Sequence, residues 1–149
     1  MPGPAVLTLE LPNRAAAAGA ARNALTSLNG SLHLVSEERL RDVQLLTTEL
    51  VANSFRHSGA VEQPVRLTVH ATDDVLRVEV HDHGKPWYVS APEPPVPGQI
   101  GGYGLHLVDT LATRWGVEDD EGTVVWFEVD RPGKREPMPA SSSRRRARR

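Results

Sequence analysis

Apolar and polar positions follow a strand pattern in four segments of the chain, which we expect to form β-strands. The second and third of these segments are separated only by the polar residues 72–74, so a hairpin is the natural connection between them. The predicted strands are 5–11, 65–71, 75–82 and 122–130.

Helical patterns fill three other segments. Strong helix formers occupy residues 13–28, and Gly30 is expected to end this first helix. The second helix is expected to begin at Ser36, which is a suitable N-cap, and to run to about His57. The third is expected over residues 104–115.

The second predicted helix carries a wide apolar stripe along one side. Because the positions of the stripe recur every three or four residues, this side is expected to be buried. Glu37 and Glu38 fall in the first turn, where acidic side chains favour the helix dipole. The stripe consists of Leu40, Val43, Thr47, Leu50 and Ser54, widened by Leu46 and Val51.

The predicted elements follow one another as strand, two helices, hairpin, long loop, helix and strand. The loop, residues 83–102, contains five prolines and no sustained period, and loops of this length are usually functional or disordered. This order predicts the α+β class: a two-layer sandwich in which a mostly antiparallel mixed sheet carries its helices on one face. Trp115 and Trp126 are expected in the core.

The composition indicates one folded domain with a basic tail. The chain has 149 residues, of which 39% are hydrophobic, which is enough for a single core. We place the domain at residues 1–130 and a disordered tail at 131–149. The tail holds eight of the 17 Lys and Arg residues but one of the 19 Asp and Glu residues, so it carries +7 and the domain −9. We read the tail as a solvated terminus; the alternative is weak electrostatic contact with nucleic acid or an acidic partner.

The sequence lacks two features, and their absence excludes several kinds of site and of protein. The chain has no cysteine, which excludes disulfides, thiolate metal sites and a cysteine nucleophile. No apolar stretch approaches the roughly 20 residues that a transmembrane helix needs, and the N-terminus lacks the features of a signal peptide. We therefore expect a soluble, cytoplasmic protein.

The stretch "ELVANSFRHSG" (49–59) places Glu49 and Asn53 one helical turn apart on one face. An Asn amide oxygen is a hard neutral ligand that suits Mg²⁺. A carboxylate one turn away can hold an attacking hydroxyl beside a metal-bound phosphate. Taken alone, an Asn near a helix end is more often a cap or a solvated side chain.

Asp82 ends a predicted strand in "HDHGKPW" (81–87). An ionised carboxylate only accepts hydrogen bonds, so it can select the exocyclic amine of adenine. Gly84 lacks a Cβ and would let a flat ring approach the backbone. In isolation the same residues indicate an ordinary turn.

Glycines 101, 102 and 104 in "GGYGLHLV" (101–108) stand at the mouth of the third predicted helix. Free amide groups at a helix start favour an anion, so this arrangement can cradle phosphates. Neither the Walker A pattern nor the G-x-G-x-x-G signature occurs in the chain.

In this order the three stretches resemble the N, G1 and G2 boxes of the GHKL (Bergerat-fold) ATPase superfamily, over roughly residues 5–130. The chain is most similar to the anti-sigma-factor serine/threonine kinases of bacterial partner-switching systems. The resemblance implies that it binds ATP and Mg²⁺, sequesters a sigma factor and phosphorylates a serine on a small anti-anti-sigma (STAS-type) protein. It also implies a possible homodimer.

The resemblance assigns roles to individual positions. It makes Glu49 the general base and Asn53 the Mg²⁺ ligand. It places Asp82 on the adenine with Gly84 beneath the ring. The remaining contacts are implied for Gly102 and Gly104, against the phosphates, and for Thr123, near adenine; an ordinary strand threonine is the alternative reading of Thr123.

The sequence departs from many family members at two positions. Lys85 stands where many have a second G1 glycine, and Tyr103 where many have an arginine between the G2 glycines. Residues 88–104 contain no Lys or Arg, although positive charge on the γ-phosphate often supplies much of the catalysis. A nucleotide-gated binding module without kinase turnover is therefore the alternative function.

A histidine-kinase catalytic fragment would need a histidine-bearing helix pair upstream, and about a dozen residues precede the first predicted helix.

His81 and His83 suggest a rival metal site, because alternate residues of a strand face the same way. A transition-metal site needs a third ligand, and no further histidine or carboxylate occurs at a recognisable spacing. His57 is expected to close the second helix, where its partial charge suits the dipole.

Overall fold

Five strands and three helices make up the part of the chain that the computed structural model describes, which is residues 3–12, 14–57, 63–83, 104–119 and 121–131. In chain order they are β1 (Ala5–Leu11), α1 (Ala17–Leu32), α2 (Glu37–His57), β2 (Val65–Ala71), β3 (Val75–Asp82), α3 (Gly104–Leu111), β4 (Arg114–Asp119) and β5 (Thr123–Asp130).

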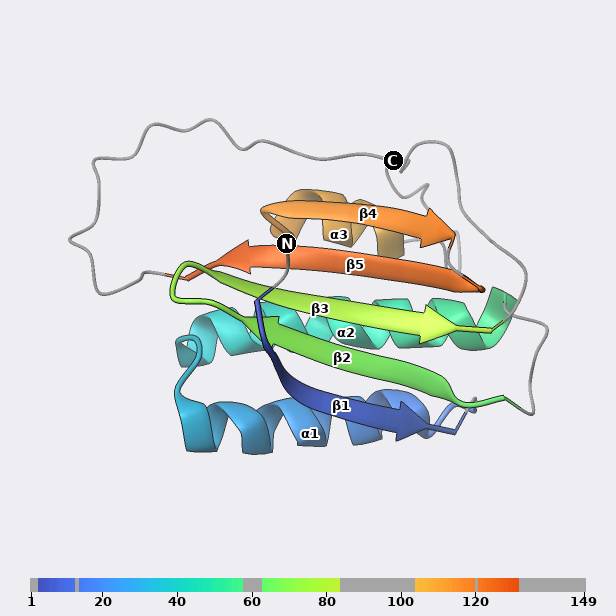
Figure 1. Cartoon of the computed structure of the whole chain (residues 1–149), viewed down its shortest axis with the longest axis horizontal. Coiled ribbons are helices and arrows are strands. Elements are labelled where there is room, and N and C mark those ends of the chain that lie inside the picture. The colour runs from blue at the N-terminus through green and yellow to red at the C-terminus, as the bar shows by residue number, and fades with distance from the viewer. Residues whose placement is uncertain (1–2, 13, 58–62, 84–103, 120, 132–149) are drawn as a thin grey trace, which may run out of the picture.

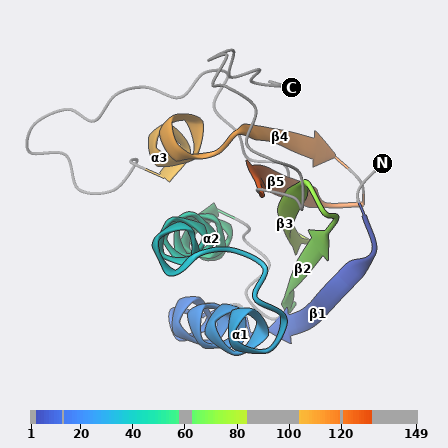
Figure 2. The ribbon, with the colours of Figure 1, turned by 90° about the vertical axis from the view of Figure 1, so that its left-hand side faces the viewer.

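The strands form one sheet in the order β1-β2-β3-β5-β4, and every neighbouring pair is antiparallel. All three helices lie against the same face of this sheet (Figures 1 and 2). The two-layer α+β fold predicted from the sequence is confirmed. Within the described residues, no helix combines the length and apolar character needed to cross a membrane.

The strand pattern of the sequence matches the two faces of the sheet. In β2, Val65, Leu67 and Val69 are buried in the core beneath the helices, while the residues between them turn to the other face. The predicted hairpin is also confirmed: β2 pairs with β3, and the Thr72 amide donates to the Val75 carbonyl at 2.9 Å.

Helix α2 is the central helix of the layer and follows its prediction closely. The Ser36 hydroxyl accepts from the Arg39 amide at 3.1 Å, which is the expected N-cap, and Glu37 begins the helix. Every residue of the predicted stripe is buried: Leu40, Val43, Leu46, Thr47, Leu50, Val51 and Ser54.

The end of α1 differs from the prediction. Gly30 lies inside the helix, which runs on to Leu32 and ends at a left-handed His33 (φ 50°). The buried Asn29 side chain fixes this end, because its amide oxygen accepts from the Val35 amide at 3.0 Å and its amide nitrogen donates to the Val35 carbonyl at 3.1 Å. Local side-chain hydrogen bonding to Val35, and not a glycine stop, therefore accompanies the end of the helix.

The segment predicted as one helix over 104–115 contains a helix and the start of a strand. Helix α3 ends at Leu111, and β4 forms the edge of the sheet by pairing with β5. Trp115 lies in this strand, opposite Phe127. The sequence pattern did not predict β4, because this strand is short and is extended through its pairing with β5.

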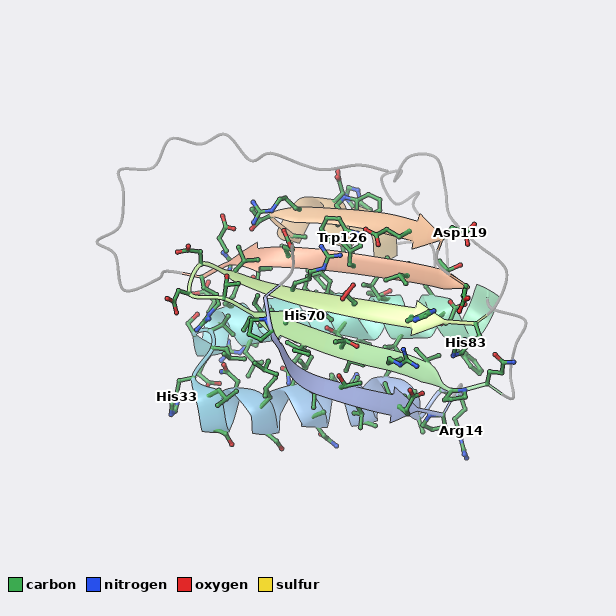
Figure 3. The ribbon with its side chains drawn as sticks, in the orientation of Figure 1. Arg14, His33, His70, His83, Asp119 and Trp126 are labelled. Carbon is green, nitrogen blue, oxygen red and sulfur yellow. The ribbon has the colours of Figure 1, made fainter. Side chains whose placement is uncertain are left out.

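The two predicted core tryptophans are both buried, on opposite faces of the sheet. Trp115 belongs to the core cluster beneath the helices. Trp126 faces the other way, as does His70 (Figure 3). The Arg77 guanidinium lies 4.1 Å from the Trp126 ring centroid, and a Cβ on Gly116 would collide with the same ring. Because Gly116 has no side chain, there is room for the Trp126 indole on the open face of the sheet, which is the face that the helices do not cover.

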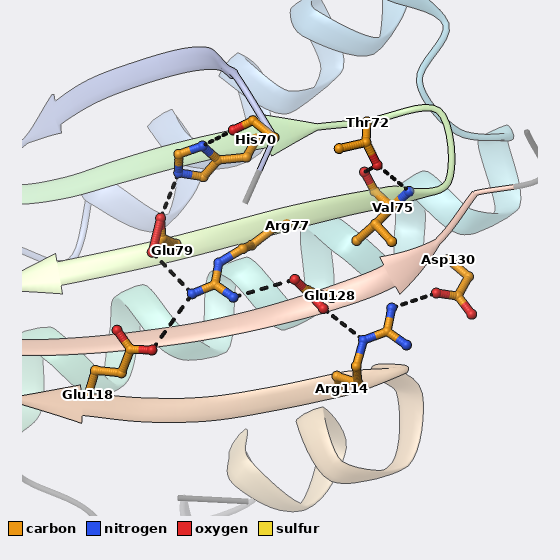
Figure 4. A network of polar contacts seen from close by, with 10 residues as sticks. His70, Thr72, Val75, Arg77, Glu79, Arg114, Glu118, Glu128 and Asp130 are labelled. Carbon is orange, nitrogen blue, oxygen red and sulfur yellow. Dashed lines mark hydrogen bonds and ion pairs between the residues drawn. The ribbon is translucent and has the colours of Figure 1, made fainter. Parts of the chain in front are cut away.

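A chain of ion pairs crosses this open face from β2 to β4 (Figure 4). Glu128 bridges two guanidinium groups, those of Arg77 at 3.4 Å and Arg114 at 2.7 Å. Burial lowers the pKa of Arg114, but hydrogen bonds to Glu128 and Asp130 outweigh it, so the pKa lies above its ordinary value. The pairs are His70–Glu79, Arg77–Glu79, Arg77–Glu118, Arg77–Glu128, Arg114–Glu128 and Arg114–Asp130.

Gly30→Ala is expected to stabilise the protein by about 0.5–1 kcal/mol, because alanine costs less conformational entropy inside a helix. A Cβ at this position would meet no atom within 4 Å. Urea unfolding of the two proteins measures the difference. A loss of stability would mean instead that Gly30 caps the helix in a left-handed conformation.

Candidate functional site

The predicted adenine-binding residues meet where β3 ends and β5 begins. Asp82 and Thr123 are direct partners across these two antiparallel strands, so their side chains share a face of the sheet. That face is the one beneath the helices, and the exposed fractions of the two residues are 2% and 0%. A carboxylate and a hydroxyl are therefore buried side by side at the end of an otherwise apolar core.

Helix α2 contributes two further polar residues, Asn53 and Ser54, both of which are buried. The Ser54 hydroxyl donates a hydrogen bond of 2.9 Å to Oδ2 of Asp82. This bond joins the stretch that resembles the N box to the stretch that resembles the G1 box. Two segments that are 28 residues apart in the chain are thus in direct contact.

Glu49 lies one turn before Asn53 on α2, as predicted from their spacing. Its side chain is partly exposed, whereas Asn53 is buried. A carboxylate that water and a second molecule can reach is suited to act on an acceptor hydroxyl. A buried amide oxygen is better suited to a fixed ligand role.

At the start of β5, one feature fits a polar ligand and another fixes the backbone beside Asp82. Oγ1 of Thr123 is buried and has no hydrogen-bond partner among the described residues, and such an orphaned group ordinarily finds a partner. Gly122 has φ +134°, and a Cβ there would collide with the Asp82 carbonyl oxygen. The backbone therefore approaches Asp82 at a distance that only glycine allows.

The phosphate side of the predicted site is described in part. Gly104 is the first residue of α3, at the helix start where the phosphate cradle was predicted. Gly84 and Gly102 lie outside the described residues. Helix α3 packs against α2, and the Trp115 indole nitrogen donates to Asp109 of α3 at 3.1 Å. The start of α3 thus belongs to a helix that is tied to both α2 and β4.

The chain matches the model of the family described as "Histidine kinase-like ATPase domain" over residues 11–129. It belongs to this family. Among curated proteins it is similar to the serine-protein kinase RsbW of Listeria innocua serovar 6a, with 28% identity over 131 residues, covering 80% of this chain and 83% of that protein. The resemblance to GHKL ATPases drawn from the three motifs is confirmed.

Two residues beside the candidate site of this histidine kinase-like ATPase domain were not nominated from the sequence. Ser54 was assigned to the buried stripe of α2, which is correct, but nothing in the sequence shows that its hydroxyl meets Asp82. Gly122 was taken as the start of the last strand, and its positive φ was not foreseen. A glycine directly before a strand that faces a motif carboxylate was the available signal.

The rival metal site receives no support from the described residues. The rings of His81 and His83 are neighbours, with centroids 5.2 Å apart. Within the described part of the chain, no group of three or more His, Cys, Asp or Glu side chains is arranged to hold a metal ion. Among the described residues, the pair is therefore without the third ligand that a transition-metal site requires.

Gly122→Ala is expected to destabilise the protein by about 2–3 kcal/mol, because it places a side chain at a positive φ and against the Asp82 carbonyl. Chemical unfolding of the free protein measures the loss. Gly30→Ala is the matched control, since the same substitution inside α1 has the opposite expected sign. A neutral result at Gly122 would show that β5 can begin with ordinary backbone geometry.

Proposed function

We propose that this protein binds ATP·Mg²⁺ at the junction of α2, β3 and β5, and that it uses ATP to phosphorylate a serine on an anti-anti-sigma partner of the STAS type. In the same proposal it sequesters a sigma factor. The observation that carries it is the buried cluster in which Ser54 holds Asp82 beside the orphaned hydroxyl of Thr123. Membership of an ATPase family supports the nucleotide.

The cluster fits the amino edge of adenine. Asp82 as a carboxylate accepts hydrogen bonds only, so it pairs with an exocyclic amine and disfavours a carbonyl at the same place. Thr123 can donate to or accept from the ring edge, directly or through water. Both groups are desolvated, so a base that lacks the matching donor would forgo a hydrogen bond to the buried carboxylate that water could not replace.

The phosphate end would be held by Asn53 and the start of α3. Asn53 provides a neutral oxygen for Mg²⁺, which neutralises phosphate charge when bound. Gly102 and Gly104 would lie against the phosphates at the start of α3, where free amide groups favour an anion. Glu49, which is partly exposed one turn from Asn53, would orient the acceptor hydroxyl and take its proton.

The kinase activity and its partners extend the proposal beyond nucleotide binding. The similarity to a serine-protein kinase supports phosphoryl transfer to a serine. The sigma factor, the anti-anti-sigma partner and a possible homodimer come from the motif resemblance described above. We expect such a regulator to be located in the bacterial cytoplasm.

A second function is favoured by one feature of the sequence. Residues 88–104 carry no Lys or Arg that could stabilise the γ-phosphate during transfer. Binding of ATP can still rest on Mg²⁺ and backbone amides. In this alternative the protein is a nucleotide-gated binding module that holds its partner and does not phosphorylate it.

ATP with Mg²⁺ is expected to raise the thermal unfolding midpoint by several degrees, because ligand at 100 times its dissociation constant adds about 2.7 kcal/mol of stability. Asp82→Asn should remove most of this shift, since it replaces one acceptor oxygen by a donor. Asp73→Asn, on the exposed β2–β3 turn, is the matched control and should keep the full shift. No shift for the unmodified protein at millimolar nucleotide would contradict the proposal.

Glu49→Gln is expected to reduce phosphorylation of an anti-anti-sigma protein by more than about hundredfold while ATP binding persists, because the amide cannot take the proton of the acceptor. Transfer of labelled phosphate from ATP provides the measurement, and Glu38→Gln in the first turn of α2 is the control. Nucleotide binding without any transfer by the unmodified protein would favour the binding module instead.

A further inference from the structure

The hydrogen bond from Ser54 to Asp82 is unusual for a serine in a helix. Helical serines commonly donate to the carbonyl of the residue four positions earlier. The hydroxyl of Ser54 donates instead across the interface between α2 and the sheet, to Oδ2 of Asp82 at 2.9 Å. Its direction is therefore set by the carboxylate and not by its own helix.

Burial makes this bond a strong constraint on the carboxylate. Ser54 is 1% exposed and Asp82 is 2% exposed. A carboxylate that is removed from water needs hydrogen-bond donors, and a donor to a charged acceptor contributes about twice as much as a donor to a neutral one. Rotation of the carboxylate would break the bond to Ser54, so the bond holds the plane of the carboxylate in one orientation.

The neighbouring hydroxyl of Thr123 does not help to orient the Asp82 carboxylate. Thr123 lies directly opposite Asp82 in the sheet, yet its Oγ1 has no hydrogen-bond partner among the described residues. The two hydroxyls beside Asp82 are thus in different situations. The Ser54 hydroxyl of α2 is bonded to the carboxylate, whereas the Thr123 hydroxyl of β5 is available to bond a ligand.

We infer that Ser54 is a positioning residue for base recognition: its hydroxyl orients Asp82 so that the carboxylate meets the exocyclic amine of a purine base. The inference rests on the proposed nucleotide site and adds a specificity determinant to it. Ser54 does not touch the nucleotide in this arrangement. Its contribution passes through Asp82, so it depends on the presence of the amine.

The test compares two nucleotides in two proteins. ATP carries the 6-amino group, and purine riboside triphosphate lacks it but is otherwise the same. Ser54→Ala is expected to weaken ATP binding about tenfold, which is the scale of one charge-assisted hydrogen bond, and to weaken binding of the analogue less than about twofold. Isothermal titration of both nucleotides with Mg²⁺ measures the four affinities.

Two further variants separate positioning from packing. Thr47→Val removes another buried hydroxyl from the inner side of α2, two turns earlier, and that hydroxyl has no partner within the described residues. This variant should leave both affinities unchanged. Ser54→Thr keeps the hydroxyl and should retain the preference for ATP over the analogue, even if the added methyl group lowers stability.

The outcomes distinguish this inference from the proposed function. Equal losses of ATP and analogue binding in Ser54→Ala would show a packing role only and would overturn the inference. Unchanged affinities would overturn it as well, while ATP binding by the unmodified protein would leave the nucleotide site intact. If the unmodified protein binds no ATP, the proposed function itself is wrong and the inference falls with it.

Discussion

The contact between α2 and the sheet is the interaction on which the rest of the structure depends. Leu46, Leu50 and Val43 are completely buried in it, and each side chain of this kind contributes about 1.5–3 kcal/mol when it leaves water. Both other helices are arranged around α2, since α1 and α3 each pack against it. The packing of α2 therefore also fixes where the polar side chains of its last turns lie relative to the sheet.

The same contact changes character along its length. Near the start of α2 it is apolar, but toward the end it holds the buried Asn53 and Ser54, and Ser54 donates to Asp82, which lies opposite Thr123 in the sheet. Burying such groups costs free energy unless they are paired, and among the described residues the Thr123 hydroxyl, beside the carboxylate, has no partner. An apolar interface that becomes polar at one end combines a stable scaffold with buried polar groups at its rim, which supports the ligand site proposed there.

The opposite face of the sheet is organised by charge. Arg77 and Arg114 alternate with Glu79, Glu128 and Asp130 over three strands, and the guanidinium of Arg77 also covers Trp126. Such pairs add modest stability when they are partly exposed, and cross-strand pairs of opposite charge favour the register in which they face one another. Register matters for the site, because the pairing that places Glu128 opposite Arg77 also places Thr123 opposite Asp82.

The sequence by itself determined the elements whose patterns are local. It predicted β1, β2 and β3 at their observed bounds, the N-cap of α2 and its buried stripe, because burial repeats with a period of two or nearly four residues wherever one face meets a core. Two of its motifs also nominated Asn53 and Asp82, and the resemblance added Thr123; the fold places Thr123 opposite Asp82 and brings Ser54, the neighbour of Asn53, into contact with Asp82. The end of α1 was missed although its partner is local, since Asn29, a side chain of the helix itself, binds Val35 six residues further on. Tertiary structure alone decided the existence of β4, which is extended because β5 pairs with it. It alone also brought the Ser54 hydroxyl to Asp82 and required a positive φ at Gly122. These features depend on partners distant in the chain or on the close approach of two backbones, and no period along a single segment encodes either of them.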